Sequence, residues 1–106
     1  MSDSVRVLEP EGIIDSAGGN QIRRKVVDLL EAGAETLLID LKNITFMDSS
    51  GLGAMVATLQ TVRKREANLF LCSLNDQVQI IMEMTKMDKV FTILPDRTAL
   101  DRTIES

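Results

Sequence analysis

Short apolar runs alternate along the chain with longer stretches in which apolar residues recur every three or four positions. The first run begins at Val5 and stops at Pro10, and the others cover residues 36–41, 69–73 and 90–94. Apolar runs of this length, bounded by polar residues and turn formers, are typical of buried strands. Because proline cannot donate a hydrogen bond to a neighbouring strand, the first strand is predicted to be short and to lie at a sheet edge.

The stretches that follow these runs have the period of amphipathic helices. Their apolar stripes are Ile22, Val26, Leu29 and Leu30; Leu52, Met55, Val56, Leu59 and Val62; Val78, Ile81 and Met82 after a cap at Asn75 or Asp76; and Leu100 and Ile104 after Pro95-Asp96. The first helix is predicted to start near Asn20, because Gly18 and Gly19 would each cost roughly 1 kcal/mol relative to alanine inside a helix. The second is predicted to cover about 52–66 and to end near Asn68, a residue that tolerates a left-handed backbone.

The order of elements is therefore strand, helix, repeated four times. Such alternation with short connections implies right-handed crossovers and a largely parallel sheet. The chain has 106 residues, of which 44% are hydrophobic, and this suits one domain with a single core. We predict one α/β domain over residues 1–106, with about four strands in a mostly parallel sheet and amphipathic helices packed on it.

Composition excludes several classes of function. The formal net charge of −4 argues against a nucleic-acid partner. Two basic clusters, Arg23-Arg24-Lys25 and Arg63-Lys64-Arg65, suit a solvated helix face or a helix C-terminus. The chain shows neither a long apolar segment nor a basic start followed by an apolar run, so a cytoplasmic protein with no membrane partner is expected.

The residues that the chain lacks exclude most catalytic sites. There is no histidine, and Cys72, the single cysteine, lies in an apolar run where a small buried hydrophobe is expected. A Ser-His-Asp or Cys-His site is therefore impossible, and zinc would depend on carboxylates alone. No lysine lies close in sequence to Ser49 for a Ser-Lys pair. We expect no catalytic residue, no metal and no cofactor.

The strongest candidate for a functional site lies where the second strand turns into the second helix, at Met47-Asp48-Ser49-Ser50-Gly51. The first N–H groups of a helix have no partners within it and carry partial positive charge, so this turn favours an anion. Ser49 and Ser50 are therefore candidates to carry a phosphate. Asp15 follows the first strand as Asp48 follows the second, and in a parallel sheet both should lie at the same end.

Each of these residues also has an ordinary structural interpretation. Asp48 with its two serines is also a normal helix-capping segment, and Asp15 is a plausible cap for the chain that leaves its strand. Gly51 and Gly53 suit close packing of the helix against a strand. The methionines Met84 and Met87 suit either core filling or an exposed, adaptable partner surface. From the residues alone these alternatives stay open.

The chain resembles the anti-sigma factor antagonists, small bacterial proteins built on the STAS domain. The segment Phe46 to Gly53 is similar to the family's phosphorylation signature, Gly12-Ile13-Ile14-Asp15 to its earlier Gly-x-x-Asp element, and residues 80–93 to its final helix-strand unit. The resemblance implies a switch without catalysis of its own. A partner that is both anti-sigma factor and ATP-dependent serine kinase phosphorylates the serine matching Ser49, with Ser50 the second candidate.

In the family, the unphosphorylated form binds the kinase and releases a sigma factor, and a serine phosphatase of the PP2C type reverses the modification. The resemblance places the surroundings of the phosphosite and the partner contacts at Asp15, Met47, Asp48, Ser50, Gly51, Met84 and Met87. A monomer or weak dimer is expected. Two alternatives remain: a STAS module that senses a nucleotide or another ligand at the same helix N-terminus, and a constitutive subunit of a larger STAS assembly whose Ser49 is never modified.

The chain departs from the family pattern at two points. The family has a further strand before the one that ends at Gly12, and too few residues precede Val5 to form it, so the first edge strand is expected to be short or missing. Lys86 stands at a turn where the family often has glycine.

Overall fold

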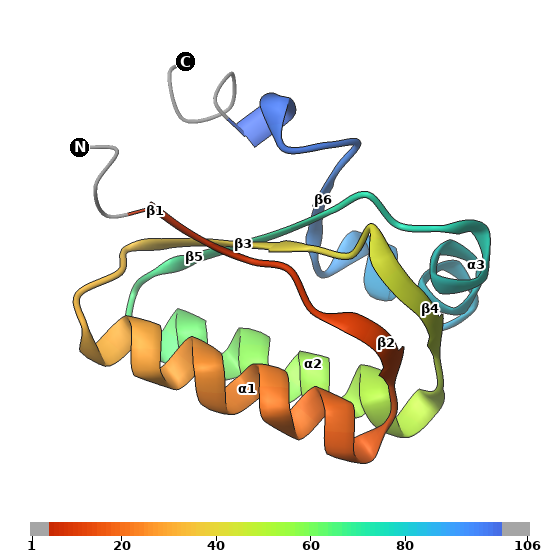
Figure 1. Cartoon of the computed structure of the whole chain (residues 1–106), viewed down its shortest axis with the longest axis horizontal. Coiled ribbons are helices and arrows are strands. Elements are labelled where there is room, and N and C mark those ends of the chain that lie inside the picture. The colour runs from red at the N-terminus through yellow and green to blue at the C-terminus, as the bar shows by residue number, and fades with distance from the viewer. Residues whose placement is uncertain (1–4, 101–106) are drawn as a thin grey trace.

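A four-stranded parallel sheet forms the centre of the fold (Figure 1). The computed structural model describes residues 5–100. The sheet consists of β1 (Val5–Leu8), β3 (Thr36–Asp40), β5 (Asn68–Cys72) and β6 (Thr92–Leu94), in the order β1-β3-β5-β6. All three strand pairs are parallel, as the alternation of strands and helices predicts.

Two long helices, α1 (Ser16–Glu31) and α2 (Ser49–Lys64), lie side by side against one face of this sheet (Figure 1). Their apolar stripes are the predicted ones, and Val26, Met55 and Val62 are fully buried. From the sheet, alternate residues of β3 and β5 meet them. Together they form the main core, which includes Ile22, Val26, Leu30, Leu37, Ile39, Leu52, Met55, Leu59, Val62, Leu69 and Leu71.

A second, two-stranded parallel sheet lies at the carboxyl end of the first. It pairs β2 (Glu11–Ile14) with β4 (Asn43–Met47), and its register slips between Gly12 and Ile13. Gly12 has a φ of +90°, which only glycine adopts without strain. Neither strand was predicted, because β2 buries one residue of its four and β4 buries two that are three positions apart. The prediction of a short first strand at the sheet edge is confirmed: β1 has four residues and lies at the edge, with Pro10 in the link to β2.

The first helix begins at Ser16, so the predicted start near Asn20 was wrong. Gly18 and Gly19 lie within its first turn, where close neighbours leave no room for a side chain. A Cβ on Gly18 would be 2.5 Å from the Ile13 carbonyl oxygen, and a Cβ on Gly19 would be 2.5 Å from the Cβ of Ala54 in α2. The glycine pair weakens the helix locally but lets α1 approach β2 and α2 closely.

The second helix starts at Ser49, three residues before the predicted Leu52, and ends at Lys64. Asp48 supplies an N-terminal cap that sequence periodicity does not detect. The left-handed residue after the helix is Glu66, with a φ of 57°, and Asn68 already belongs to β5. The predicted end was therefore displaced by two residues.

The last third of the chain follows the predicted order. Helix α3 (Asp76–Met84) starts after Asn75, whose side chain caps it; of the two predicted caps, Asn75 and Asp76, the structure selects Asn75. Lys86 has a left-handed φ of 62° and precedes a single 3-10 turn at Met87–Lys89. The final strand begins at Thr92, two residues after the predicted start at Val90.

A small cluster of Leu38, Cys72 and Leu100 lies apart from the main core. Cys72 is fully buried, as predicted. Residues 98–100 form the beginning of the predicted last helix, and Ile104 lies outside the described residues. No helix within residues 5–100 combines the length and the apolar character needed to cross a membrane.

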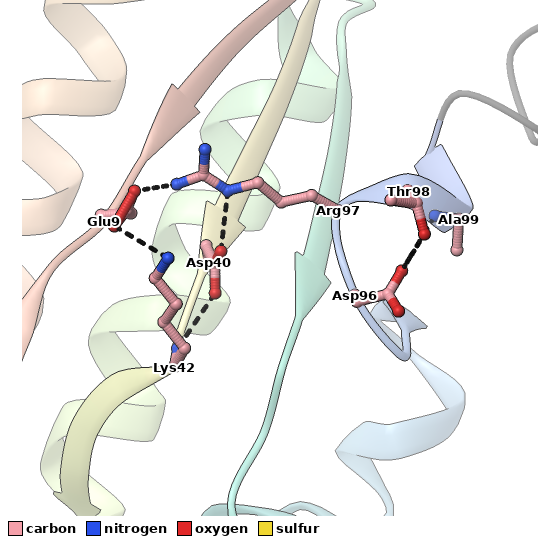
Figure 2. A network of polar contacts seen from close by, with 7 residues as sticks. All are labelled: Glu9, Asp40, Lys42, Asp96, Arg97, Thr98 and Ala99. Atoms are coloured by element: carbon pink, nitrogen blue, oxygen red, sulfur yellow. Dashed lines mark hydrogen bonds and ion pairs between the residues drawn. The ribbon is translucent and has the colours of Figure 1, made fainter.

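Charged residues fasten the segment after β6 to the end of the sheet (Figure 2). Arg97 Nε donates to Asp40 Oδ2 over 2.8 Å, and its Nη2 pairs with Glu9, which also pairs with Lys42 over 3.5 Å. Burial alone would raise the pKa of Asp40, which is 2% exposed, but the hydrogen bonds from Arg97 and from the Lys42 N–H lower it below its usual value.

Candidate functional site

The two predicted aspartates leave neighbouring strands. Ile14 and Met47 are register partners in the small sheet, so Asp15 and Asp48 follow side by side. The Asp48 N–H donates to the Ile14 carbonyl oxygen over 3.2 Å, which extends the pairing into the turn. The prediction that both carboxylates lie at one end of the strands is confirmed, although the strands concerned are β2 and β4 rather than those predicted.

Both aspartates cap the helices that follow them, in the same way. Asp15 Oδ1 accepts a hydrogen bond from the Gly18 N–H over 2.8 Å, and Asp48 Oδ1 accepts one from the Gly51 N–H over 2.8 Å. The spacing Asp-Ser-x-Gly is therefore used twice. The structural interpretation of both residues as helix caps is confirmed, and it leaves their serines at the first helical position.

The two candidate serines differ in what their hydroxyls contact. The Ser50 hydroxyl donates to Asp48 Oδ1 over 2.9 Å. Ser49 is exposed, and within residues 5–100 its hydroxyl takes part in no hydrogen bond. The pKa of Asp48 is lowered, first by the Gly51 N–H and then by the Ser50 hydroxyl, so its carboxylate is ionised at neutral pH.

Gly51 packs the start of α2 directly onto β2. A Cβ at Gly51 would lie 1.9 Å from the Ile14 carbonyl oxygen, so no residue with a side chain fits there unless the backbone shifts. The packing role considered for Gly51 is therefore confirmed. For Gly53 it is wrong, since a Cβ there would meet nothing within 4 Å.

Met47 lies inside the molecule rather than at its surface. Its side chain is fully buried and offers no surface to a partner, while its place beside the candidate phosphosite stays a prediction. Its backbone is held by Gln77 from α3: Gln77 Oε1 accepts from the Met47 N–H over 2.8 Å, and Gln77 Nε2 donates to the Met47 carbonyl oxygen over 2.9 Å. Gln77 was not predicted as a site residue, because nothing in the local sequence distinguishes it from an ordinary exposed helix residue.

Two apolar side chains are exposed just before the caps. Ile13 is 55% exposed and Phe46 is 44% exposed, and they are register partners on the outer face of the small sheet. Both precede a buried apolar residue, as inside and outside positions alternate along a strand. The paired doublets Ile13-Ile14 and Phe46-Met47 are the sequence signal that could have identified them.

The two methionines have different surroundings. Met84 is 78% exposed, whereas Met87 is partly buried against the main core. Met84 lies seven residues after Gln77 along α3, a separation of roughly 10 Å at the rise of an α-helix. The structure therefore assigns Met87 to packing and leaves Met84 at the surface.

No described part of the chain gathers three or more side chains of the kinds that ligate metal ions. A hollow of about 440 Å³ lies between α1 and the β1–β2 link, lined among others by Glu9, Glu11 and Lys25. Neither Asp48 nor Ser49 belongs to its lining.

Comparisons with known proteins agree on one family. The model of the STAS domain matches residues 1–100. The anti-sigma-B factor antagonist of Bacillus subtilis (strain 168) is 35% identical over 82 residues, which are 77% of this chain and 74% of that protein.

Solved structures show the same fold. An anti-sigma factor antagonist from Mycobacterium paratuberculosis matches with a TM-score of 0.83 at 22% identity, over 98% of this chain and 88% of that one. The antagonist SpoIIAA in its unphosphorylated form matches with a TM-score of 0.76 at 21% identity, over 96% and 90%. The phosphorylated form of SpoIIAA, a Bacillus cell fate determinant, matches with a TM-score of 0.68 at 21% identity, over 94% and 91%.

Proposed function

Because this chain belongs to the STAS domain family of anti-sigma factor antagonists, we propose that it is a binding module switched by phosphorylation of Ser49. Unphosphorylated, it binds an anti-sigma factor and releases a sigma factor; phosphorylated, it lets the anti-sigma factor go. The observation that carries the proposal is the exposed Ser49 hydroxyl, at the first position of α2 and one residue after a capping aspartate.

The choice of Ser49 over Ser50 follows from their hydrogen bonds. A hydroxyl that attacks the γ-phosphate of ATP must turn its oxygen toward the phosphorus and give its proton to a base. The Ser50 hydroxyl is held by its hydrogen bond to Asp48 Oδ1 over 2.9 Å, so its orientation is set by the turn rather than by a kinase. Ser49 has no such bond within the described residues and lies open to a kinase.

The turn accommodates a phosphate without unfolding. A phosphate adds roughly 1.5 to 2 negative charges at pH 7, and the free N–H groups of a helix start favour them. The new charge nevertheless lies one residue from the ionised Asp48 and close along the chain to the exposed Phe46. A partner surface complementary to a neutral hydroxyl and apolar side chains would lose that complementarity, and each 1.4 kcal/mol lost weakens binding about tenfold.

The proposal also fixes the kinds of partner. The anti-sigma factor is itself the ATP-dependent serine kinase, and a PP2C-type phosphatase restores the hydroxyl. The chain is the substrate of these enzymes rather than an enzyme, and it works in the cytoplasm without nucleic acid, as a monomer or weak dimer. The absence of histidine from the sequence supports this, since the chain cannot form a histidine-dependent catalytic site of its own.

Phosphosite mapping of the protein from its native cells tests the proposal. The wild type, Ser49→Ala and the matched Ser50→Ala variant are compared with and without phosphatase treatment. We expect phosphate on Ser49 in the wild type and in Ser50→Ala, its removal by the phosphatase, and none in Ser49→Ala. A wild-type protein that carries no phosphate on Ser49 in any growth condition contradicts the proposal.

A further inference from the structure

One edge of strand β4 carries no neighbouring strand within the described residues, and the side chains of Gln77 in α3 and of the α3 cap residue Asn75 bond to it. Its other edge pairs with β2, and the small sheet has two strands. On the free edge, Asn75 Nδ2 donates to the Ile44 carbonyl oxygen over 2.9 Å, and the Gln77 amide bonds the N–H and the carbonyl of Met47 over 2.8 and 2.9 Å. Two side-chain amides therefore take the place of a third strand.

The Gln77 contact reproduces what a neighbouring strand would give. A strand residue offers its N–H and its carbonyl oxygen on one side, and the carboxamide of Gln77 meets both with its oxygen and its nitrogen. On the opposite side, the next residue donates its N–H to the Ile14 carbonyl oxygen over 3.2 Å. The backbone just before Ser49 is therefore held from both sides.

The hydrogen bonds between Gln77 and the Met47 backbone matter for stability because Met47 is buried. Met47 is fully buried, so water does not replace the Gln77 amide at its N–H and carbonyl in the folded state. Gln77 is fixed in turn because α3 is anchored in the core by Val78 and Met82, which are 0% and 1% exposed. The start of α3 is also capped by Asn75, which bonds the Val78 N–H over 2.9 Å. Helix α3 and the Ser49 turn therefore form one connected unit.

We propose that Gln77 is a positioning residue for Ser49. It fixes the peptide of Met47, so that Asp48 caps α2 and the backbone of Ser49 is presented to a kinase in one conformation. Through the same contact, any displacement of α3 also displaces the backbone just before Ser49. The part of this inference that concerns phosphoryl transfer rests on the proposed function, whereas the mechanical coupling does not.

Amide hydrogen exchange, measured by NMR on the full chain, tests the coupling. Gln77→Ala removes both hydrogen bonds, and Gln79→Ala, a change on the exposed side of the same helix, is the matched control. We expect the protection of the Met47 amide to fall on the order of tenfold relative to that of Val26 in α1, as the loss of an ordinary hydrogen bond implies. An equal change at Met47 and Val26, or none at Met47, overturns the coupling.

A conservative variant separates positioning from simple stability. Gln77→Glu keeps an acceptor for the Met47 N–H, but as a carboxylate it has no proton to donate to the Met47 carbonyl oxygen. We expect intermediate protection of the Met47 amide at neutral pH, rising toward that of the wild type as the introduced carboxyl is protonated. Protection that does not change with pH in this variant contradicts the two-bond geometry.

Phosphorylation kinetics test the role in phosphoryl transfer. With a clarified extract of the native cells and ATP as the kinase source, the maximal rate of Ser49 phosphorylation should fall about tenfold in Gln77→Ala, with a much smaller change in KM, because a small misplacement of a reacting group slows the chemical step. Val62→Ala, a core change at the far end of α2, controls for lost stability and should keep the rate. An unchanged maximal rate in Gln77→Ala overturns this role.

Different results would overturn the proposed function and the coupling between Gln77 and Met47. If wild-type Ser49 receives no phosphate from the extract, the proposed function falls, and the role of Gln77 in phosphoryl transfer falls with it. The exchange experiment still decides the coupling between Gln77 and Met47 in that case.

Discussion

Gly51 lies so close to Ile14 that a Cβ on Gly51 would be 1.9 Å from the Ile14 carbonyl oxygen. This approach seats the first turn of α2 on the end of β2. The same carbonyl oxygen accepts a hydrogen bond from the Asp48 N–H over 3.2 Å. The Ile14 carbonyl therefore both holds the turn before α2 and excludes a side chain at position 51. The position of Ser49 therefore depends on the absence of a side chain two residues later.

The first prediction compares two glycines of the same helix. Gly51→Ala should lower the free energy of unfolding by about 1–3 kcal/mol or more, because backbone atoms must shift to admit the methyl group. Gly53→Ala should raise it by about 0.5–1 kcal/mol, since a Cβ there meets nothing within 4 Å and alanine favours the helix. Urea unfolding of both variants measures the difference, and equal effects would contradict the packing described.

A second prediction concerns the turn after α3. Lys86 has a left-handed φ of 62°, where a residue with a side chain is strained and glycine is not. Glycine also makes the unfolded chain more flexible, which offsets part of this gain. Lys86→Gly should therefore raise the free energy of unfolding by a net amount of about 0.5–1 kcal/mol. Lys89, in the following 3-10 turn, has no such strain, and Lys89→Gly should be destabilising. Thermal unfolding of the pair checks this; a loss of stability in Lys86→Gly rules the explanation out.

The third prediction addresses the ion pairs that hold the segment after β6. Arg97→Ala leaves the buried carboxylate of Asp40 without its charged partner and should cost about 1–2 kcal/mol, a value reduced because Arg97 itself is 41% exposed. Arg65→Ala is the control, because its contact with Glu31 over 3.8 Å is exposed and should contribute under about 0.5 kcal/mol. Equal losses in urea unfolding would show that the Asp40 contact has no special weight.

A fourth prediction follows from the lowered pKa of Asp40, whose usual value is 3.8. As the pH falls, the unfolded chain takes up this proton before the folded chain does, because the folded pKa is the lower one. The contribution of the carboxylate to stability is therefore complete above the unfolded value and is lost as the pH falls through the folded one. Below about pH 4, stability should decline less steeply in Asp40→Asn than in the wild type. Parallel slopes for the two proteins would count against this assignment.

The strand whose pattern is clearest in the sequence, β3, is covered on both faces. All five residues of β3 are buried, so its apolar run is unbroken and visible. Strands β2 and β4 were missed because one of their faces is open and exposes Ile13 and Phe46, and because amides some thirty residues away close the free edge of β4. Local patterns carry no information about such a partner.

As with the strands, the residues of the candidate site that have a local sequence signal were predicted, and those that depend on tertiary contacts were not. Asp15, Asp48 and the two serines were found because helix capping and the end of a strand are local features. The separation of Ser49 from Ser50 required the hydrogen bond between Ser50 and Asp48, and Gln77 required the tertiary contact with Met47. The start of α1 was misplaced because the reason for Gly18-Gly19 lies in neighbouring elements rather than in α1 itself.

The central claim is that phosphate on Ser49 switches the affinity for an anti-sigma factor. Isothermal titration calorimetry with the cognate anti-sigma factor, comparing the unphosphorylated protein, the protein phosphorylated at Ser49, and Ser49→Ala, measures this most directly. We predict that phosphorylation raises Kd at least tenfold, a change of about 1.4 kcal/mol, and that Ser49→Ala binds like the unphosphorylated protein. The same Kd for the phosphorylated and unphosphorylated forms would contradict the account.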